Sequence, residues 1–89
     1  MDAKSKSDFE CVRYCLLIVA NLAVCQTNHP QLMAEALPVL AQFGAHRDVK
    51  CRQYSIFAIG NLCANSENLE GIVREGCLKT LIRVQNSST

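Results

Sequence analysis

The chain has 89 residues, and a hydrophobic content of 49% excludes an intrinsically disordered polypeptide and leaves room for one small domain. Nine lysines and arginines against eight aspartates and glutamates give a net charge of +1, with the basic residues scattered along the chain. We therefore expect neither nucleic acid nor an anionic membrane as a partner.

The first predicted element is a long apolar helix over residues 8–26, preceded by a polar flexible tail over residues 1–7. Ser7-Asp8-Phe9-Glu10 has the spacing of a capping box, with a hydroxyl at the N-cap and a glutamate three residues later. Apolar residues follow at steps of three and four around most of the helix. This distribution predicts a helix that is buried on more than one side.

Residues 28–65 are predicted to form three helices. Asn28 is a candidate N-cap for a short helix with Pro30 in its first turn, and a break follows at Glu35-Ala36. Pro38 starts a second helix of about two turns that ends near Gly44.

The third helix of this set is long, and we expect Asp48 to be its N-cap. Residues 66–85 repeat the two short helices, with Gly76 suited to the left-handed conformation that closes a helix. Residues 86–89 are predicted to be a frayed tail. No segment has the pattern of a strand, so the predicted fold class is all-α.

An internal repeat of 40 residues relates the two long helices. Between residues 8–23 and 48–63, five pairs are identical where about one is expected by chance. They are Asp8 and Asp48, Cys11 and Cys51, Tyr14 and Tyr54, Asn21 and Asn61, and Leu22 and Leu62. A period near 40 is typical of stacked helical units, which usually present an ordered face to a partner.

The repeated segments resemble the armadillo repeat. The third-helix pattern of that family is similar to residues 8–23 and 48–63, most closely in Phe57-Ala58-Ile59-Gly60-Asn61-Leu62. The bridge between its first and second helices resembles Glu35-Ala36-Leu37-Pro38-Val39-Leu40. The resemblance implies a right-handed α-solenoid in which residues 8–26 are the third helix of an incomplete repeat, 28–65 a complete repeat, and 66–85 the first two helices of the next.

Such arrays normally need about three units. We therefore expect either a fragment of a longer solenoid or a very short array that buries its ends against copies of itself.

In armadillo proteins the third helices line a concave groove, and the resemblance implies that an extended peptide or a partner helix binds there. The residues expected to face this groove are Tyr14, Leu17, Asn21, Tyr54, Phe57, Asn61 and Asn65. An amide side chain offers a donor and an acceptor to a peptide backbone, and rings and leucine provide apolar pockets. The alternative is that each asparagine ties its own helix end or a neighbouring loop.

The charged residues expected at the rim of the groove are Arg13, Lys50 and Arg52. They favour an acidic ligand. The alternative is that they are ordinary solvated charges. Armadillo readers of basic signals use tryptophans and acidic residues, whereas this chain has no tryptophan and the groove set has no acidic residue. A lysine- or arginine-rich ligand is therefore not expected.

Five of the six cysteines occupy apolar helix positions, namely Cys11, Cys15, Cys51, Cys63 and Cys77. This placement predicts reduced core residues in a cytoplasmic protein or, alternatively, in a nuclear one. Cys25, at a predicted helix end, is expected to be exposed. Cys11 and Cys15 could place two thiolates on one helical face, but no second Cys/His pair has zinc-ligand spacing. No phosphate loop or catalytic pair of carboxylates is present. We therefore expect no catalytic residues, no metal and no cofactor.

The expected function is thus a non-catalytic protein-interaction module, part of a larger scaffold or adaptor. The alternative is a structural element whose open solenoid ends stack into homo-oligomers. No apolar run reaches the roughly 18 residues of a membrane span, so no direct membrane insertion is expected.

Overall fold

The computed structural model describes the backbone of residues 3–77 and the side chains of residues 9–77. This part of the chain consists of helices and turns, without a strand. The elements in chain order are α1 (Ala3–Leu22), the 3-10 turn η1 (Gln26–Asn28), α2 (His29–Glu35), α3 (Leu37–Phe43), α4 (Val49–Cys63), the 3-10 turn η2 (Ser66–Asn68) and α5 (Leu69–Arg74). The all-α prediction is confirmed for these residues.

Helix α1 begins at Ala3, so the predicted start at Asp8 is wrong, and residues 3–7 are helix where a flexible tail was expected. Alanine and lysine have high helix propensity, and Ala3, Lys4 and Lys6 allow the helix to extend through the polar segment. A capping-box spacing in the sequence does not compel a helix to begin there.

The breaks between the short helices follow from local chemistry, as predicted. Pro30 and Pro38 stand in the first turns of α2 and α3, where a missing N–H removes no intrahelical bond. Ala36 separates the two helices, and its N–H donates to the carbonyl of Leu32 at 2.8 Å. The two-turn length of α3, which ends before Gly44, is confirmed.

Helix α4 begins after the N-cap that the sequence predicts. The Asp48 carboxylate accepts a hydrogen bond from the N–H of Cys51 at 3.0 Å, which satisfies one of the unpaired donors of the first turn. At the far end of the described residues, Gly76 has φ 88°, the left-handed conformation expected of it. The predicted tail over 86–89 and most of the predicted helix after Gly76 lie outside the described residues.

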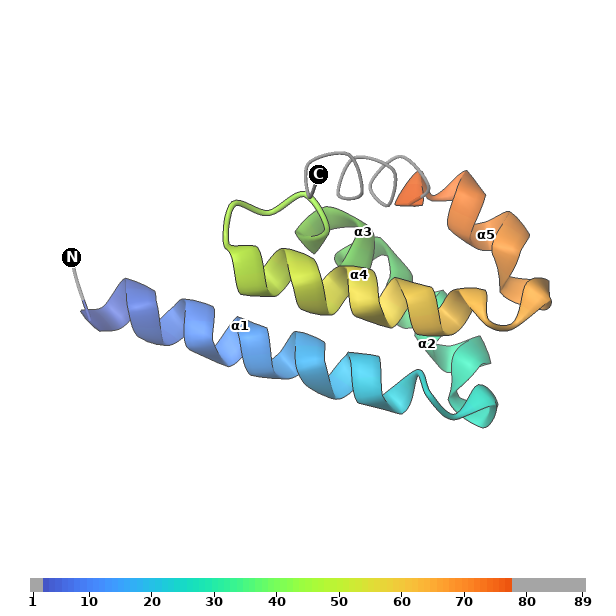
Figure 1. The fold of residues 1–89 in the computed structure, drawn as a ribbon, viewed down its shortest axis with the longest axis horizontal. Coiled ribbons are helices and arrows are strands. Elements are labelled where there is room, and N and C mark those ends of the chain that lie inside the picture. The colour runs from blue at the N-terminus through green and yellow to red at the C-terminus, as the bar shows by residue number, and fades with distance from the viewer. Residues whose placement is uncertain (1–2, 78–89) are drawn as a thin grey trace.

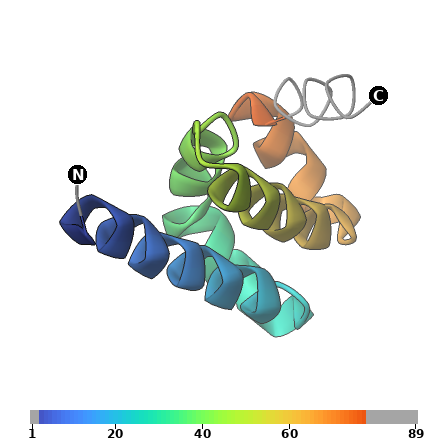
Figure 2. The same ribbon diagram turned by 60° about the vertical axis from the view of Figure 1, so that its left-hand side comes forward.

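The 40-residue repeat is visible in the backbone. The turn η1 and helix α2 begin 40 positions before η2 and α5, respectively. Helices α1 and α4 lie side by side and run in the same direction, with α2 and α3 behind them (Figures 1 and 2). Repeated sequence therefore produces repeated local structure.

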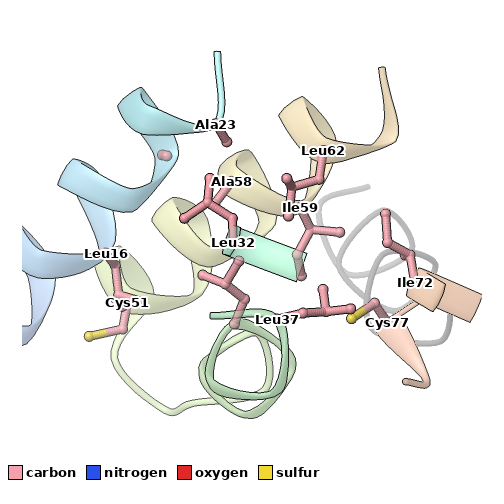
Figure 3. Close-up of a cluster of buried hydrophobic side chains, with 12 residues drawn as sticks. Leu16, Ala23, Leu32, Leu37, Cys51, Ala58, Ile59, Leu62, Ile72 and Cys77 are labelled. Atoms are coloured by element: carbon pink, nitrogen blue, oxygen red, sulfur yellow. The ribbon is translucent and has the colours of Figure 1, made fainter. Parts of the chain in front are cut away.

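One core joins the five helices of the described residues (Figure 3). Its fully buried side chains are small or branched, which allows the helices to approach closely, and each buried leucine or isoleucine stabilises the fold by about 1.5–3 kcal/mol. The core consists of Leu16, Ala20, Ala23, Leu32, Leu37, Leu40, Cys51, Ala58, Ile59, Leu62, Ile72 and Cys77.

Helix α1 is buried on one side only, so the expectation of burial on more than one side is wrong. Ile18 and Leu22 are exposed, because α4 covers only the opposite side of the helix. For the same reason Cys11 and Cys15 are exposed, and their assignment to the core is wrong. Cys51 and Cys77 are buried as expected.

No single helix among the described residues is long and apolar enough to span a membrane. One pair, Phe9–Leu22 with Gln26–Glu35, reaches that length and composition only when joined across a bend of 114°.

Candidate interaction surface

An ion pair joins the start of α4 to α1. The Arg13 guanidinium donates to both oxygens of Asp48, from Nη2 to Oδ1 at 2.7 Å and from Nε to Oδ2 at 3.0 Å. The hydrogen bonds from Arg13, and then that from the N–H of Cys51, hold the pKa of Asp48 well below its usual range. A bidentate pair fixes both position and orientation, so it sets the register between the two long helices.

A second bond joins the far ends of the same helices. The Asn61 side chain donates from Nδ2 to the carbonyl oxygen of Ala20 at 2.9 Å. That carbonyl is free to accept because the N–H of Val24 turns instead to the carbonyl of Asn21. Asn61 is therefore committed to a neighbouring helix end through one of its two N–H donors, and its amide oxygen and second N–H remain for another partner.

The predicted groove tyrosines are brought together. Tyr14 and Tyr54 line one pocket of about 150 Å³ between α1 and α4, together with Glu10, Arg13 and Lys50. Tyr14 is 62% exposed, and Tyr54 is half-buried against the core. Two rings from equivalent repeat positions thus form one surface feature.

A second hollow lies on α4 itself. It has a volume of about 420 Å³ and is lined by Gln53, Ile56, Phe57, Gly60 and Asn61. Phe57, another predicted groove residue, is 60% exposed there, whereas Leu17 at the equivalent position of α1 is half-buried. Asn21 is exposed.

Asn65 has a local role in the structure. Its side-chain oxygen accepts a hydrogen bond from the N–H of Glu67 at 3.1 Å and so caps η2. The Asn65 amide nitrogen lies outside this bond.

The three predicted rim cations differ in their surroundings. Arg13 is bound to Asp48, and Arg52 donates to the carbonyls of His46 and Arg47, which fastens the loop before α4. Lys50 is exposed and lies beside the tyrosine pocket. Of the three, Lys50 is the cation best placed to meet a ligand.

A polar network that the sequence patterns did not predict holds the turns after α1 and α4. Asn28 donates to the carbonyl of Leu22, and Asn68 donates to that of Leu62, both at 2.9 Å. Asn28 therefore ties the preceding helix, and its predicted role as side-chain N-cap of α2 is wrong. The recurrence of asparagine after 40 residues was the signal in the sequence.

His29 connects the two turns. It is 3% exposed, and its Nε2 lies 2.7 Å from the carbonyl of Ala23, while its Nδ1 lies 3.0 Å from the amide nitrogen of Asn68. An amide nitrogen donates only, so Nδ1 is the acceptor and Nε2–H donates to Ala23. His29 thus satisfies a carbonyl from the turn after α1 and an amide from the turn after α4.

The cysteines contribute little chemistry to this surface. The Cys25 thiol lies 2.9 Å from the hydroxyl of Thr27, and this hydrogen bond lowers the pKa of Cys25. Cys25 is exposed, as expected. Within residues 9–77, no group of three His, Cys, Asp or Glu side chains is placed to hold a metal ion.

Comparison of the chain with protein-family models, with curated proteins and with solved structures found no match.

Proposed function

We propose that this chain is a non-catalytic protein-interaction module of armadillo-like, right-handed solenoid form, which binds an extended peptide across α1 and α4. The observation that supports the proposal is the pocket shared by Tyr14 and Tyr54, with Phe57 exposed one turn farther along α4. Tyrosine and phenylalanine bury large areas at little cost in side-chain entropy, and they are frequent anchors of protein interfaces.

The polar groups near these rings suit a peptide backbone. Asn21 is exposed with both amide groups available among the described residues, and the oxygen of Asn61 can accept a backbone N–H. Lys50 at the edge of the tyrosine pocket favours an acidic side chain in the ligand. The proposed ligand is thus an extended segment with an apolar side chain and an adjacent acidic residue.

The test is selection of binders from a displayed library of unstructured peptides, followed by affinity measurement with purified variants. The double variant Tyr14→Ala, Phe57→Ala should weaken the selected peptides by at least about tenfold, because each ring is expected to contribute more than about 1 kcal/mol. Both rings are exposed, so the fold should persist. Val39→Ala on α3, also exposed, is the matched control.

Asn21→Ala should weaken the same peptides severalfold, the effect of one hydrogen bond of about 1 kcal/mol. Asn61→Ala is unsuitable here because it also breaks the bond to Ala20. Peptides that bind the folded double variant as tightly as the wild type would show that this surface is not the binding site.

A further inference from the structure

The contact between α1 and α4 is made by two different faces. From α1 come Leu16, Ala20 and Ala23, which are buried and recur at steps of four and three. From α4 come Asp48 and Asn61, whose bonds to Arg13 and Ala20 place them against α1. We call these the forward face of α1 and the backward face of α4.

The backward face of α4 is a continuous stripe. Cys51 follows Asp48 by three positions, and Ala58 precedes Asn61 by three, so these residues share one side of the helix. Cys51 and Ala58 are both 0% exposed. The centre of the stripe is therefore covered in the folded chain, and Asp48 and Asn61 at its ends are half-buried.

The same backward face exists on α1, where it is uncovered. The equivalents of Cys51, Ala58 and Asn61 are Cys11, Ile18 and Asn21, and all three are exposed. No described element lies on the side of α1 that is turned away from α4 (Figures 1 and 2).

The forward face also exists a second time, on α4. Ile56, Gly60 and Cys63 correspond to Leu16, Ala20 and Ala23 of α1. Gly60 is exposed, Ile56 and Cys63 are half-buried, and Ile56 and Gly60 line the 420 Å³ hollow. A Cβ at Gly60 would meet nothing within 4 Å. One molecule thus exposes a backward face on α1 and a forward face on α4, and the same two kinds of face already pack together inside the chain.

Hydrogen-bonding groups on the two open faces are complementary. The N–H of Ala64 donates to the carbonyl of Asn61 at 3.3 Å, as Val24 does to Asn21, and so turns away from the carbonyl of Gly60. Gly60 therefore offers the acceptor that Ala20 offers to Asn61. Asn21 has the equivalent side-chain donor, which no described residue uses.

The sizes of the side chains compensate as well. Inside the chain, Ala58 on the backward face meets a forward face that carries Ala20, and both are buried. Between copies, the larger Ile18 would meet a forward face that carries Gly60 and a hollow. Added volume on one face is matched by space on the other.

We propose that a second copy of this chain packs the forward face of its α4 onto the backward face of α1, with the amide of Asn21 donating to the carbonyl of Gly60. Because the two faces differ, the contact is heterologous, and a third copy adds in the same way. The chain is therefore a self-stacking unit whose assembly extends the surface of the long helices.

The test uses one charged substitution for each face, Ile18→Glu and Gly60→Glu. Both sites are exposed, so folding should persist, and circular dichroism checks it. Sedimentation of the wild-type protein from micromolar to millimolar concentration should show a mass that rises with concentration. Each variant alone should remain a monomer, since a buried glutamate would lack a partner.

An equimolar mixture of the two variants should form a dimer and stop there. Gly60→Glu retains an intact α1 face and Ile18→Glu retains an intact α4 face, so one productive contact remains. Val39→Glu on α3 is the matched control and should associate as the wild type does. A wild-type monomer at all concentrations, variants that associate normally, or a mixture that stays monomeric would each overturn the proposal.

Thiol alkylation gives an independent readout. Cys11 lies on the backward face, so its alkylation should slow by about tenfold as the protein associates, because a covered thiol is inaccessible to the reagent. Cys25, exposed in the turn after α1, is the internal reference and should keep its rate. Association that leaves the rate at Cys11 unchanged would place the contact elsewhere and overturn the proposal.

Discussion

Helices α1 and α4 share a sequence pattern but differ in their surroundings. Cys11, Ile18 and Leu22 are exposed on α1, whereas Cys51, Ala58 and Leu62 at the equivalent positions of α4 are buried. Helix α4 is covered by α1 on one side and α3 on another, but α1 is covered on one side only. Equivalent positions in the two helices therefore show that the burial of a side chain depends on the neighbouring helices as well as on its residue type.

The difference also shows how successive repeats are connected. Each boundary uses a polar bond from an asparagine side chain. Asn61 donates to the Ala20 carbonyl at the end of α1, and Asn68 donates to the His29 ring in the preceding turn. The first bond satisfies a carbonyl that the end of α1 leaves unpaired, and the second satisfies a buried ring nitrogen. On the open side of α1, Asn21 has no such carbonyl among the described residues.

The sharpest test of the comparison is to truncate the same residue in both helices. Leu62 is 0% exposed and Leu22 is 46% exposed. Leu62→Ala should lower the free energy of unfolding by about 2–5 kcal/mol, because a cavity remains in the core. Leu22→Ala should lower it by less than about 1 kcal/mol. Urea unfolding of dilute protein measures both, and equal losses would contradict the assigned burial.

Equivalent cysteines should differ strongly in reactivity. Burial, followed by the nearby Asp48, raises the pKa of Cys51 from 9.0 to about 11, which lowers its thiolate fraction near neutral pH by about 100-fold. Cys11 is exposed. Alkylation of dilute protein, followed by mass spectrometry of the peptides, should therefore label Cys11 long before Cys51. Comparable rates in the folded protein would show that α1 does not cover α4.

The equivalent asparagines Asn28 and Asn68 should have unequal effects. Asn68→Ala leaves the Leu62 carbonyl and a ring nitrogen of His29 without a partner in the interior, a cost of about 1–3 kcal/mol. Asn28→Ala removes one exposed bond and should cost about 0.5–1 kcal/mol. Thermal unfolding distinguishes them, and a larger loss for Asn28→Ala would contradict the proposed link between the turns.

Ser55 provides a test with the opposite sign. It is 0% exposed, and its hydroxyl is a buried side-chain oxygen without a hydrogen-bond partner among the described residues. Ser55→Ala should therefore raise the free energy of unfolding by about 1 kcal/mol. The matched change at the exposed equivalent, Cys15→Ala, should stay within about 0.5 kcal/mol of the wild type. Destabilisation by Ser55→Ala would reveal a hidden hydrogen bond.

Much of the local structure could be predicted from the sequence, because its causes are local. Pro30 and Pro38 start helices, Asp48 caps one, and Gly76 adopts positive φ, each through its own backbone or side chain. The start of α1 was missed because good helix formers precede the capping box. Neighbouring residues are sufficient to explain these features.

The surface was less predictable, because burial and hydrogen-bond partners depend on residues distant in sequence. The pattern that buries Cys51 leaves Cys11 exposed, and nothing within either helix distinguishes them. The partner of Asn61 depends on where α1 ends and on the N–H of Val24, which donates to Asn21 and leaves the Ala20 carbonyl free. The residue spacing predicted Tyr14 and Tyr54 as groove residues, but their shared pocket depends on the parallel arrangement of α1 and α4.

The smallest expected effect concerns the ion pair between the helices and its dependence on pH. The pKa of Asp48 is lowered in the folded state, so its contribution to stability is present above the unfolded pKa of about 3.9 and is lost as the pH falls below that value. Asp48→Asn retains an effective N-cap but removes the titrating group.

The free energy of urea unfolding of Asp48→Asn should consequently fall less than that of the wild type between neutral and acidic pH. Arg13→Gln removes the other partner and should flatten the same part of the curve, because the remaining carboxylate loses the main cause of its lowered pKa. If both variants keep the wild-type slope, the ion pair between Arg13 and Asp48 does not stabilise the folded protein.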